Sequence, residues 1–133
     1  MRRLIIRPGA IGDFVVSLPA LEYLRQDAQH LEVWCAGPNA ALARFADRAR
    51  SIVATGLDRL ELGNSDVVPE LRAFDDIVSW YGANRAPFRD RVQALGLPFR
   101  FFRALPPEGC EMHAADFYLY EAGAPPGAAP RIP

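Results

Sequence analysis

The stretch RPGAIGDFVVSLPAL, residues 7–21, connects a short apolar strand to an apolar helix. Between the two lie a pair of glycines, Gly9 and Gly12, and a lone carboxylate, Asp13. Glycine lets the backbone turn tightly and approach a ligand closely. The first turn of a helix presents free amides and a partial positive charge. The stretch therefore predicts a ligand-facing loop that delivers one carboxylate to the start of a helix.

Strand-like and helix-like segments alternate along the rest of the chain. Strands are expected at residues 3–7, 31–37, 51–56, 75–82 and 99–105, and helices at 13–27, 39–49, 86–95 and 111–122. This alternation predicts an α/β fold, a Rossmann-like open parallel sheet of about five strands with helices on both faces. Ligands of such sheets bind beyond the carboxyl ends of the strands, where the loop at 8–12 would lie.

Composition places the chain among globular proteins without a strong charge bias. It has 133 residues, 50% of them hydrophobic and 23% charged, with a net charge of −1. A nucleic-acid partner or a polybasic membrane anchor is therefore not expected. All 15 basic residues are arginine, so any phosphate contact falls to a planar guanidinium. The cysteines Cys35 and Cys110 form no cluster with histidine, and no metal site is expected.

The end of the chain differs from the rest. Residues 124–133 are rich in proline, glycine and alanine and are expected to form a linker-like tail after one domain spanning 1–123. No segment approaches the ~20 apolar residues that span a bilayer. The first apolar run is also too short for a signal peptide. A cytoplasmic protein with at most peripheral association to a membrane is expected.

From the residues alone, the loop is either a phosphate-binding loop for a dinucleotide or a site centred on Asp13. Its G-x-x-G spacing is not the G-x-G-x-x-G of dinucleotide-binding loops, and the second strand ends in Cys35-Ala36-Gly37 without an acid for a ribose. Asp13 itself is either an N-cap of the helix or a base for a substrate hydroxyl held against it.

The segment LIIRPGAIGDFVVSLPALEYLR, residues 4–25, resembles the start of glycosyltransferase family 9, the ADP-heptose:lipopolysaccharide heptosyltransferases. In that family the first strand leads through a short loop into Gly-Asp, followed several residues later by Pro-Ala. Gly12-Asp13 and Pro19-Ala20 match this pattern. Residues 75–96 and 113–125 resemble later parts of the family's N-terminal domain more loosely.

The resemblance implies the N-terminal half of a two-domain inverting transferase of the GT-B fold, which needs no metal. In that family the N-terminal domain binds a glycolipid acceptor, and the C-terminal domain binds the nucleotide sugar. The residue that matches Asp13 is the general base. This chain is then an acceptor-binding half whose second domain is absent, so it is inactive alone and meets a donor such as ADP-heptose only with that domain. The alternatives are a non-catalytic binding module of the same fold and a small-nucleotide-binding domain.

Several further residues are candidates for contacts with an acceptor, beside Gly9 and Gly12. Arg7 can orient Asp13, bind an anion or simply be a solvated strand end. Asn84 and Arg85 follow the fourth strand, where Arg85 can hold a phosphate with two hydrogen bonds or be an exposed arginine at a helix start. His113 can contact a ligand from the start of the last helix or lie on the surface.

Three other residues have a structural interpretation. Trp80 is expected in the core rather than stacked on a sugar. The neighbours Asp75 and Asp76 point to opposite faces of a strand and are expected to be a solvated strand start rather than an acid/base pair.

Overall fold

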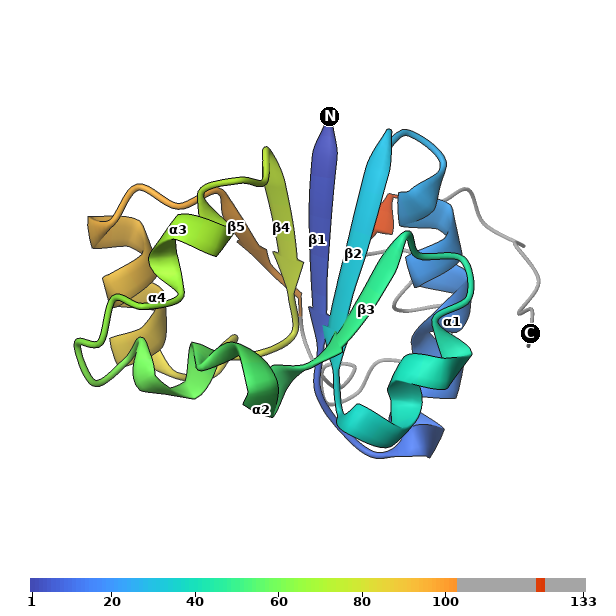
Figure 1. Ribbon diagram of the computed structural model, residues 1–133, viewed down its shortest axis with the longest axis horizontal. Coiled ribbons are helices and arrows are strands. Elements are labelled where there is room, and N and C mark those ends of the chain that lie inside the picture. Colours follow the sequence, from blue (N-terminus) through green and yellow to red (C-terminus); the bar gives the residue numbers. More distant parts are fainter. Residues whose placement is uncertain (103–121, 124–133) are drawn as a thin grey trace, which may run out of the picture.

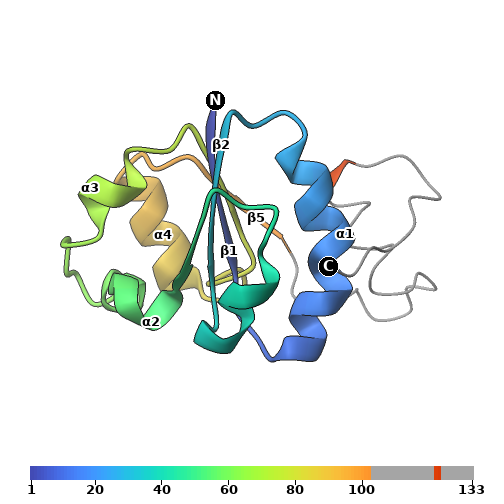
Figure 2. The same ribbon diagram turned by 45° about the vertical axis from the view of Figure 1, so that its right-hand side comes forward.

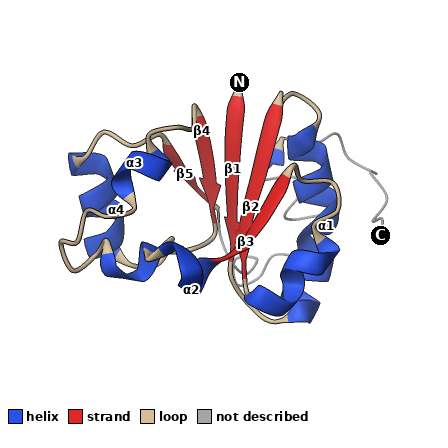
Figure 3. Cartoon of the chain, in the orientation of Figure 1, coloured by secondary structure: helices blue, strands red, loops and turns tan. Residues whose placement is uncertain are grey.

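The computed structural model describes residues 1–102 and 122–123. Most of the helix expected at 111–122, together with the tail, lies outside these residues. The sheet consists of five strands in the order β3-β2-β1-β4-β5, and every neighbouring pair is parallel (Figures 1 and 3). The strands are β1 (Arg2–Arg7), β2 (His30–Cys35), β3 (Arg48–Ser51), β4 (Asp76–Ser79) and β5 (Phe99–Phe101). The expected open parallel sheet is thus confirmed.

Helices cover both faces of this sheet, as expected. The long helix α1 (Ile11–Arg25) lies on one face, and α2 (Ile52–Thr55), α3 (Val68–Leu71) and α4 (Ala86–Ala94) lie on the other (Figures 1 and 2). Two short 3₁₀ helices, η1 (Gly37–Leu42) and η2 (Leu57–Arg59), follow β2 and α2. Among the described helices, none combines the length and apolar character needed to cross a membrane.

Alternation along β1 divides the core into two layers. Leu4 and Ile6 pack on the α4 side, whereas Ile5 packs on the α1 side, and all three are fully buried. Each such side chain contributes about 1.5–3 kcal/mol to the free energy of unfolding. The apolar face of α1 is buried against the sheet by Phe14, Leu18, Leu21 and Leu24. The central strand is therefore held from both sides.

The segment between β2 and η2 differs from the prediction. The helix expected at 39–49 is only the 3₁₀ helix η1, and the strand expected at 51–56 is instead the helical turn α2. The chain must return to the other end of the sheet, because β3 begins at Arg48 opposite Glu32. The Asp47 carboxylate accepts a hydrogen bond from Leu31 N at 2.8 Å and guides this return. Pairing between strands thus prevails over local helical pattern.

A glycine turn joins β4 to α4. Gly82 has φ +76°, a left-handed backbone conformation that residues other than glycine rarely adopt. A Cβ at this position would also overlap the Phe88 ring, lying 2.8 Å from its Cγ. The turn therefore needs glycine for two reasons, and it sets where α4 begins.

A buried charge cluster closes the amino end of the sheet. The Arg3 side chain donates to Asp27 Oδ1 at 2.5 Å, to Asp76 Oδ2 at 2.7 Å and to Leu24 O. Arg100 donates to both carboxylate oxygens of Asp76, at 2.8 and 2.7 Å. The expectation of a solvated Asp76 is therefore wrong, because only 16% of its side chain is exposed.

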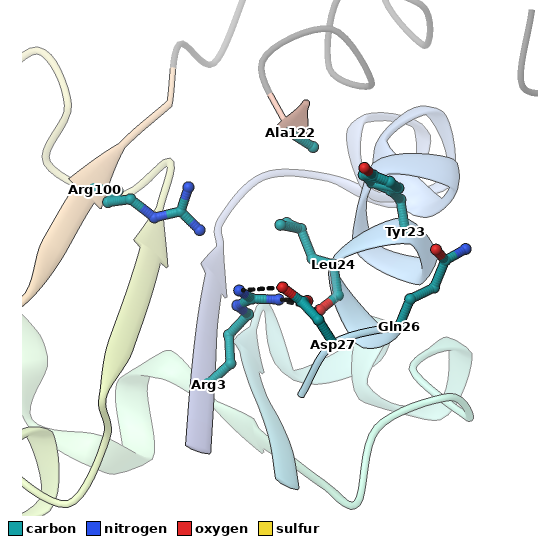
Figure 4. A pocket seen from close by; sticks show the side chains of 7 residues that line it. All are labelled: Arg3, Tyr23, Leu24, Gln26, Asp27, Arg100 and Ala122. Carbon is teal, nitrogen blue, oxygen red and sulfur yellow. Dashed lines mark hydrogen bonds and ion pairs between the residues drawn. The ribbon is translucent and has the colours of Figure 1, made fainter. Parts of the chain in front are cut away.

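This cluster also determines the ionisation of its acids. Burial opposes the charge on Asp76, but hydrogen bonds from Arg100 and Arg3 outweigh it and hold the pKa of Asp76 below its usual range. A pocket of about 240 Å³ opens beside Arg3, between Asp27, Arg100 and the end of α1 (Figure 4). Arg3 pairs with Asp27 and Asp76, and Arg100 pairs with Asp76, so the cluster holds the sheet and α1 together.

Replacing Gly82 by alanine should destabilise the protein more than the same change at Gly96. Both residues have positive φ, +76° and +68°, and share about 1–2 kcal/mol of backbone strain as alanine. Only position 82 adds overlap with Phe88, since nothing lies within 4 Å of a Cβ at Gly96. Urea unfolding should give a further loss of about 1–3 kcal/mol for Gly82→Ala. Equal losses in the two variants would contradict the overlap with Phe88.

Asp76→Asn should lower stability at neutral pH and flatten its acid dependence. The depressed pKa of Asp76 contributes stability that is present above the unfolded pKa of about 4 and is lost as the pH falls below it. The variant should lose about 2–3 kcal/mol at pH 7, because Arg3 keeps Asp27 as a partner. Between about pH 5 and pH 2 its free energy of unfolding should fall less steeply than that of the wild type. The exposed control Asp66→Asn should keep the wild-type slope; a wild-type slope in Asp76→Asn would refute this role.

Candidate functional site

The loop after β1 places the expected carboxylate inside the first turn of α1. Ala10 is extended and holds the N-cap position, Ile11 is the first helical residue and Asp13 the third. No side chain caps this helix end. The hypothesis that Asp13 is an N-cap is therefore wrong. Its charge still lies close to the helix N-terminus, where a negative group is favoured.

The two glycines of the loop have different roles. Gly9 has φ +111°, so the tight turn out of β1 depends on it. Gly12 is an exposed helical residue, and a Cβ there would meet nothing within 4 Å. The expectation of a turn that needs glycine holds at Gly9. Gly12 has no side chain and therefore leaves open space beside Asp13.

The Asp13 carboxylate lies on the outside of this loop. The residue is exposed, and its Oδ2 is 3.0 Å from the place where a Cβ on Gly9 would stand. The carboxyl group thus folds back over Gly9. Across residues 1–102 and 122–123, no group donates a hydrogen bond to it. Both carboxylate oxygens are available to a ligand at the carboxyl edge of the sheet.

Arg7 supports this loop from below. Only 2% of the residue is exposed, and its guanidinium lies over the Trp80 ring at 5.4 Å. Nη1 donates to Pro8 O at 3.0 Å, Nη2 to Asp13 O at 3.3 Å and Nε to Ser17 Oγ at 3.2 Å. The interpretation as a solvated strand end is wrong. Arg7 orients Asp13 through its backbone carbonyl and not through its carboxylate.

Asn39 is a second buried support of the loop. It is the first residue of the helix expected at 39–49, but its side chain makes no capping bond. Instead Nδ2 donates to Gly9 O at 3.1 Å, and 2% of the residue is exposed. A local pattern cannot find such a contact, because Asn39 follows a different strand from the loop that it binds.

The loop after β4 carries the remaining candidates on the α4 side of the same edge. Asn84 is exposed in the turn, and Arg85 stands immediately before α4. The Arg85 guanidinium donates to both carboxylate oxygens of Glu61, at 2.8 and 2.7 Å. Hydrogen bonds from Arg85 hold the pKa of Glu61 below its usual range. Any anion that binds Arg85 competes with Glu61, which lies in a segment without a clear sequence pattern.

Pairing between strands brings these two loops to neighbouring points. β1 and β4 are adjacent, with Ile6 opposite Ser79, and Trp80 N donates to Ile6 O at 2.9 Å. Trp80 is buried in the core, as expected, whereas Tyr81 is half-buried against Phe88 at the edge. The edge therefore combines the Asp13 loop with the Asn84–Arg85 turn, and His113 lies outside the described residues.

The described residues form neither a metal site nor a reactive thiol. No set of three His, Cys, Asp or Glu side chains there is placed to hold a metal ion. Burial raises the pKa of the Cys35 thiol to about 11, which keeps it protonated at neutral pH. Two pockets lie away from the Asp13 edge, the one beside Arg3 and another of about 430 Å³ along α4 and β5. Asp13 is an exposed carboxylate at this edge, and within the described part of the chain nothing donates a hydrogen bond to it.

The fold is similar to that of known transferases, although the sequence comparisons found nothing. No family model matches the chain, and no curated protein matches its sequence. Two solved structures of E. coli heptosyltransferase WaaC, one with ADP and one with ADP-2-deoxy-2-fluoro heptose, match 98% of the chain at 15% identity. Their TM-scores are 0.51 and 0.53. The chain spans about half of those proteins, 49% and 50%, and shares with them its Rossmann-like α/β fold.

Proposed function

We propose that this chain is the acceptor-binding half of a heptosyltransferase-like inverting glycosyltransferase that acts in lipopolysaccharide or glycan synthesis. One observation carries the proposal. The Asp13 carboxylate is exposed and unpaired among the described residues, and it lies at the carboxyl edge of a sheet whose fold resembles a heptosyltransferase. The loop below it is held by buried donors. A general base needs this combination of free lone pairs and a defined position.

The chemistry assigned to Asp13 is removal of one proton. An acceptor hydroxyl lies within about 2.6–3.2 Å of a carboxylate oxygen, which takes its proton as the hydroxyl oxygen attacks the anomeric carbon of the donor. The bond from that carbon to the nucleoside diphosphate breaks on the opposite face, and the diphosphate leaves with the electron pair. The sugar configuration is thereby inverted, and the proton resides on Asp13 until solvent removes it.

Acceptor contacts are assigned to residues around this base. Because Gly12 has no side chain, there is room for a sugar beside Asp13. Asn84 and Arg85, with His113, would contact the acceptor, and the paired Glu61 and Arg85 offer both acceptors and donors to sugar hydroxyls. Arg7 and Gly9 act from within the loop. A glycolipid acceptor would bring the protein to the cytoplasmic side of the inner membrane without insertion.

The donor is assigned to a second domain. The chain corresponds to about half of the WaaC structures, which supports a longer protein in which residues 124–133 lead from a domain at 1–123 to a domain for the nucleotide sugar. ADP-heptose is the donor that the similarity favours. The isolated chain should then bind an acceptor but transfer nothing.

Asp13→Asn should abolish turnover and spare the fold. In the two-domain protein, loss of the base should lower kcat by about 10²-fold or more, measured as release of nucleoside diphosphate. Stability should change by less than about 1 kcal/mol, because Asp13 contributes only through the helix dipole and not as a cap. Donor affinity should stay unchanged. The exposed Asp90→Asn on α4 is the matched control and should turn over normally; normal turnover of Asp13→Asn would overturn the proposal.

Calorimetry on residues 1–133 should detect no useful binding of ADP-heptose. The physical reason is that the donor site is assigned to the other domain, and ADP serves as the comparison ligand. Micromolar binding of either compound to this chain would instead favour the small-nucleotide-binding alternative. An Asp13→Asn variant that loses such binding would place the nucleotide at the loop itself.

A further inference from the structure

A single buried amide joins the end of β2 to the loop that carries Asp13. Asn39 lies in η1, directly after β2, where its backbone N donates to Ala36 O at 2.8 Å. Its side-chain Nδ2 donates to Gly9 O at 3.1 Å, and the residue is 2% exposed. The backbone of Asn39 is thus fixed by its own turn, and its side-chain amide reaches across to the neighbouring loop. Two parallel strand ends are tied together by this contact.

The Gly9 peptide is the part of the loop that matters most for Asp13. Gly9 adopts φ +111°, and the Asp13 Oδ2 lies 3.0 Å from the position of a Cβ on Gly9. A rotation of the Gly9 peptide would therefore change the surface over which the carboxyl group is folded. The flanking carbonyls, Pro8 O and Asp13 O, are held by Arg7. Among the described side chains, Asn39 is the donor to Gly9 O.

We propose that Asn39 is a positioning residue, which fixes the Asp13 carboxylate through the Gly9 carbonyl. Its consequence for turnover rests on the proposed function of Asp13. A base that is displaced by about 1 Å from its productive place can lose about 10²-fold in rate. Asn39 does not touch the reacting atoms; it restricts where the base can be.

Asn39→Asp tests the contact with almost no change of shape. At neutral pH the new side chain has no N–H, and its carboxylate oxygen faces the Gly9 carbonyl, so the bond is replaced by repulsion. When acid protonates the new carboxyl group, its O–H can donate to Gly9 O again. Asn39→Ala removes the donor without adding a charge. Asn64→Asp is the matched control, because Asn64 Oδ1 accepts from Asp66 N in a turn away from the site.

The first measurement needs no enzyme activity. NMR spectra of the 133-residue chain should show displaced backbone signals at Gly9 and Ala10 and a displaced carboxyl carbon signal at Asp13 in both Asn39 variants. Signals of β4 and α4 should stay in place. On acidification, the Gly9 signals of Asn39→Asp should return toward those of the wild type at the same pH. Asn64→Asp should leave all three residues unchanged.

The second measurement separates positioning from general support of the fold. In the two-domain protein, Asn39→Asp should lower kcat by about 10²-fold, with KM for the donor unchanged. In an Asp13→Asn background the same substitution should add little further loss, because no base remains to be positioned. Independent, additive losses would mean that Asn39 acts on turnover by another route and would overturn its assignment.

The two hypotheses fail in different ways. Unchanged Gly9 and Asp13 signals in both Asn39 variants would overturn the positioning role, even if Asp13→Asn abolishes transfer. Displaced signals without any effect of Asp13→Asn on turnover would reject the base and leave the contact established only as a structural one. If Asn39→Asp and Asn39→Ala both unfold the whole chain, Asn39 supports the fold at large and the proposal is wrong.

Discussion

Two arginines at the ends of the central strand hold α1 in one place. Arg3 and Arg7 lie on the same face of β1 as Ile5, and they are 5% and 2% exposed. Arg3 donates to Leu24 O in the last turns of α1, and Arg7 donates to Asp13 O in its first turn. A buried guanidinium without partners costs several kcal/mol. Any shift of the helix along the strand would break the hydrogen bonds that both arginines donate to its carbonyls, so the position of the loop follows from this constraint.

The two ends of β1 use their arginines differently. At the amino edge Arg3 meets the carboxylates of Asp27 and Asp76, and the charges neutralise one another. At the carboxyl edge the described partners of Arg7 are carbonyls, the Ser17 hydroxyl and an aromatic ring. An arginine paired with Asp13 would have weakened that carboxylate as a base. The same residue type therefore closes one edge and leaves the other free for chemistry.

Much of the fold could be predicted because burial leaves a strong periodic pattern. β1, β2, β4, α1 and α4 all carry apolar residues at strand or helix spacing, and the structure contains each of them. β3 is an edge strand with the sequence RARS, which has no apolar face to reveal it. Conversely, Ile52 and Thr55 lie three residues apart on one side of a helical turn, although IVAT is typical of a strand. Pairing with β2 includes RARS and ends at Ser51, so IVAT lies beyond the sheet, and a local pattern contains no information about where that pairing ends.

The candidate site was predictable in its chemistry and not in its supports. Asp13 and Gly9 could be found because a carboxylate after a glycine loop at a strand end has a known meaning. Asn39 and Glu61 could not, because each binds a residue at least 24 positions away in the chain. The distinction between Ala10 and Asp13 as the N-cap also depends on where the helix begins, which sequence patterns place only within a few residues.

A Rossmann-like fold serves many functions, so the choice between a catalytic half and a binding module depends on particular side chains. A carboxylate that stabilises a fold has partners, as Asp76 and Asp47 have here. Asp13 caps no helix and has no hydrogen-bond partner in the described ranges, yet the loop beneath it is held by two buried donors. Its position is therefore better defined than its own interactions require. Rigid support beneath a free carboxylate is what proton transfer needs and what a passive surface does not, and this favours the catalytic proposal.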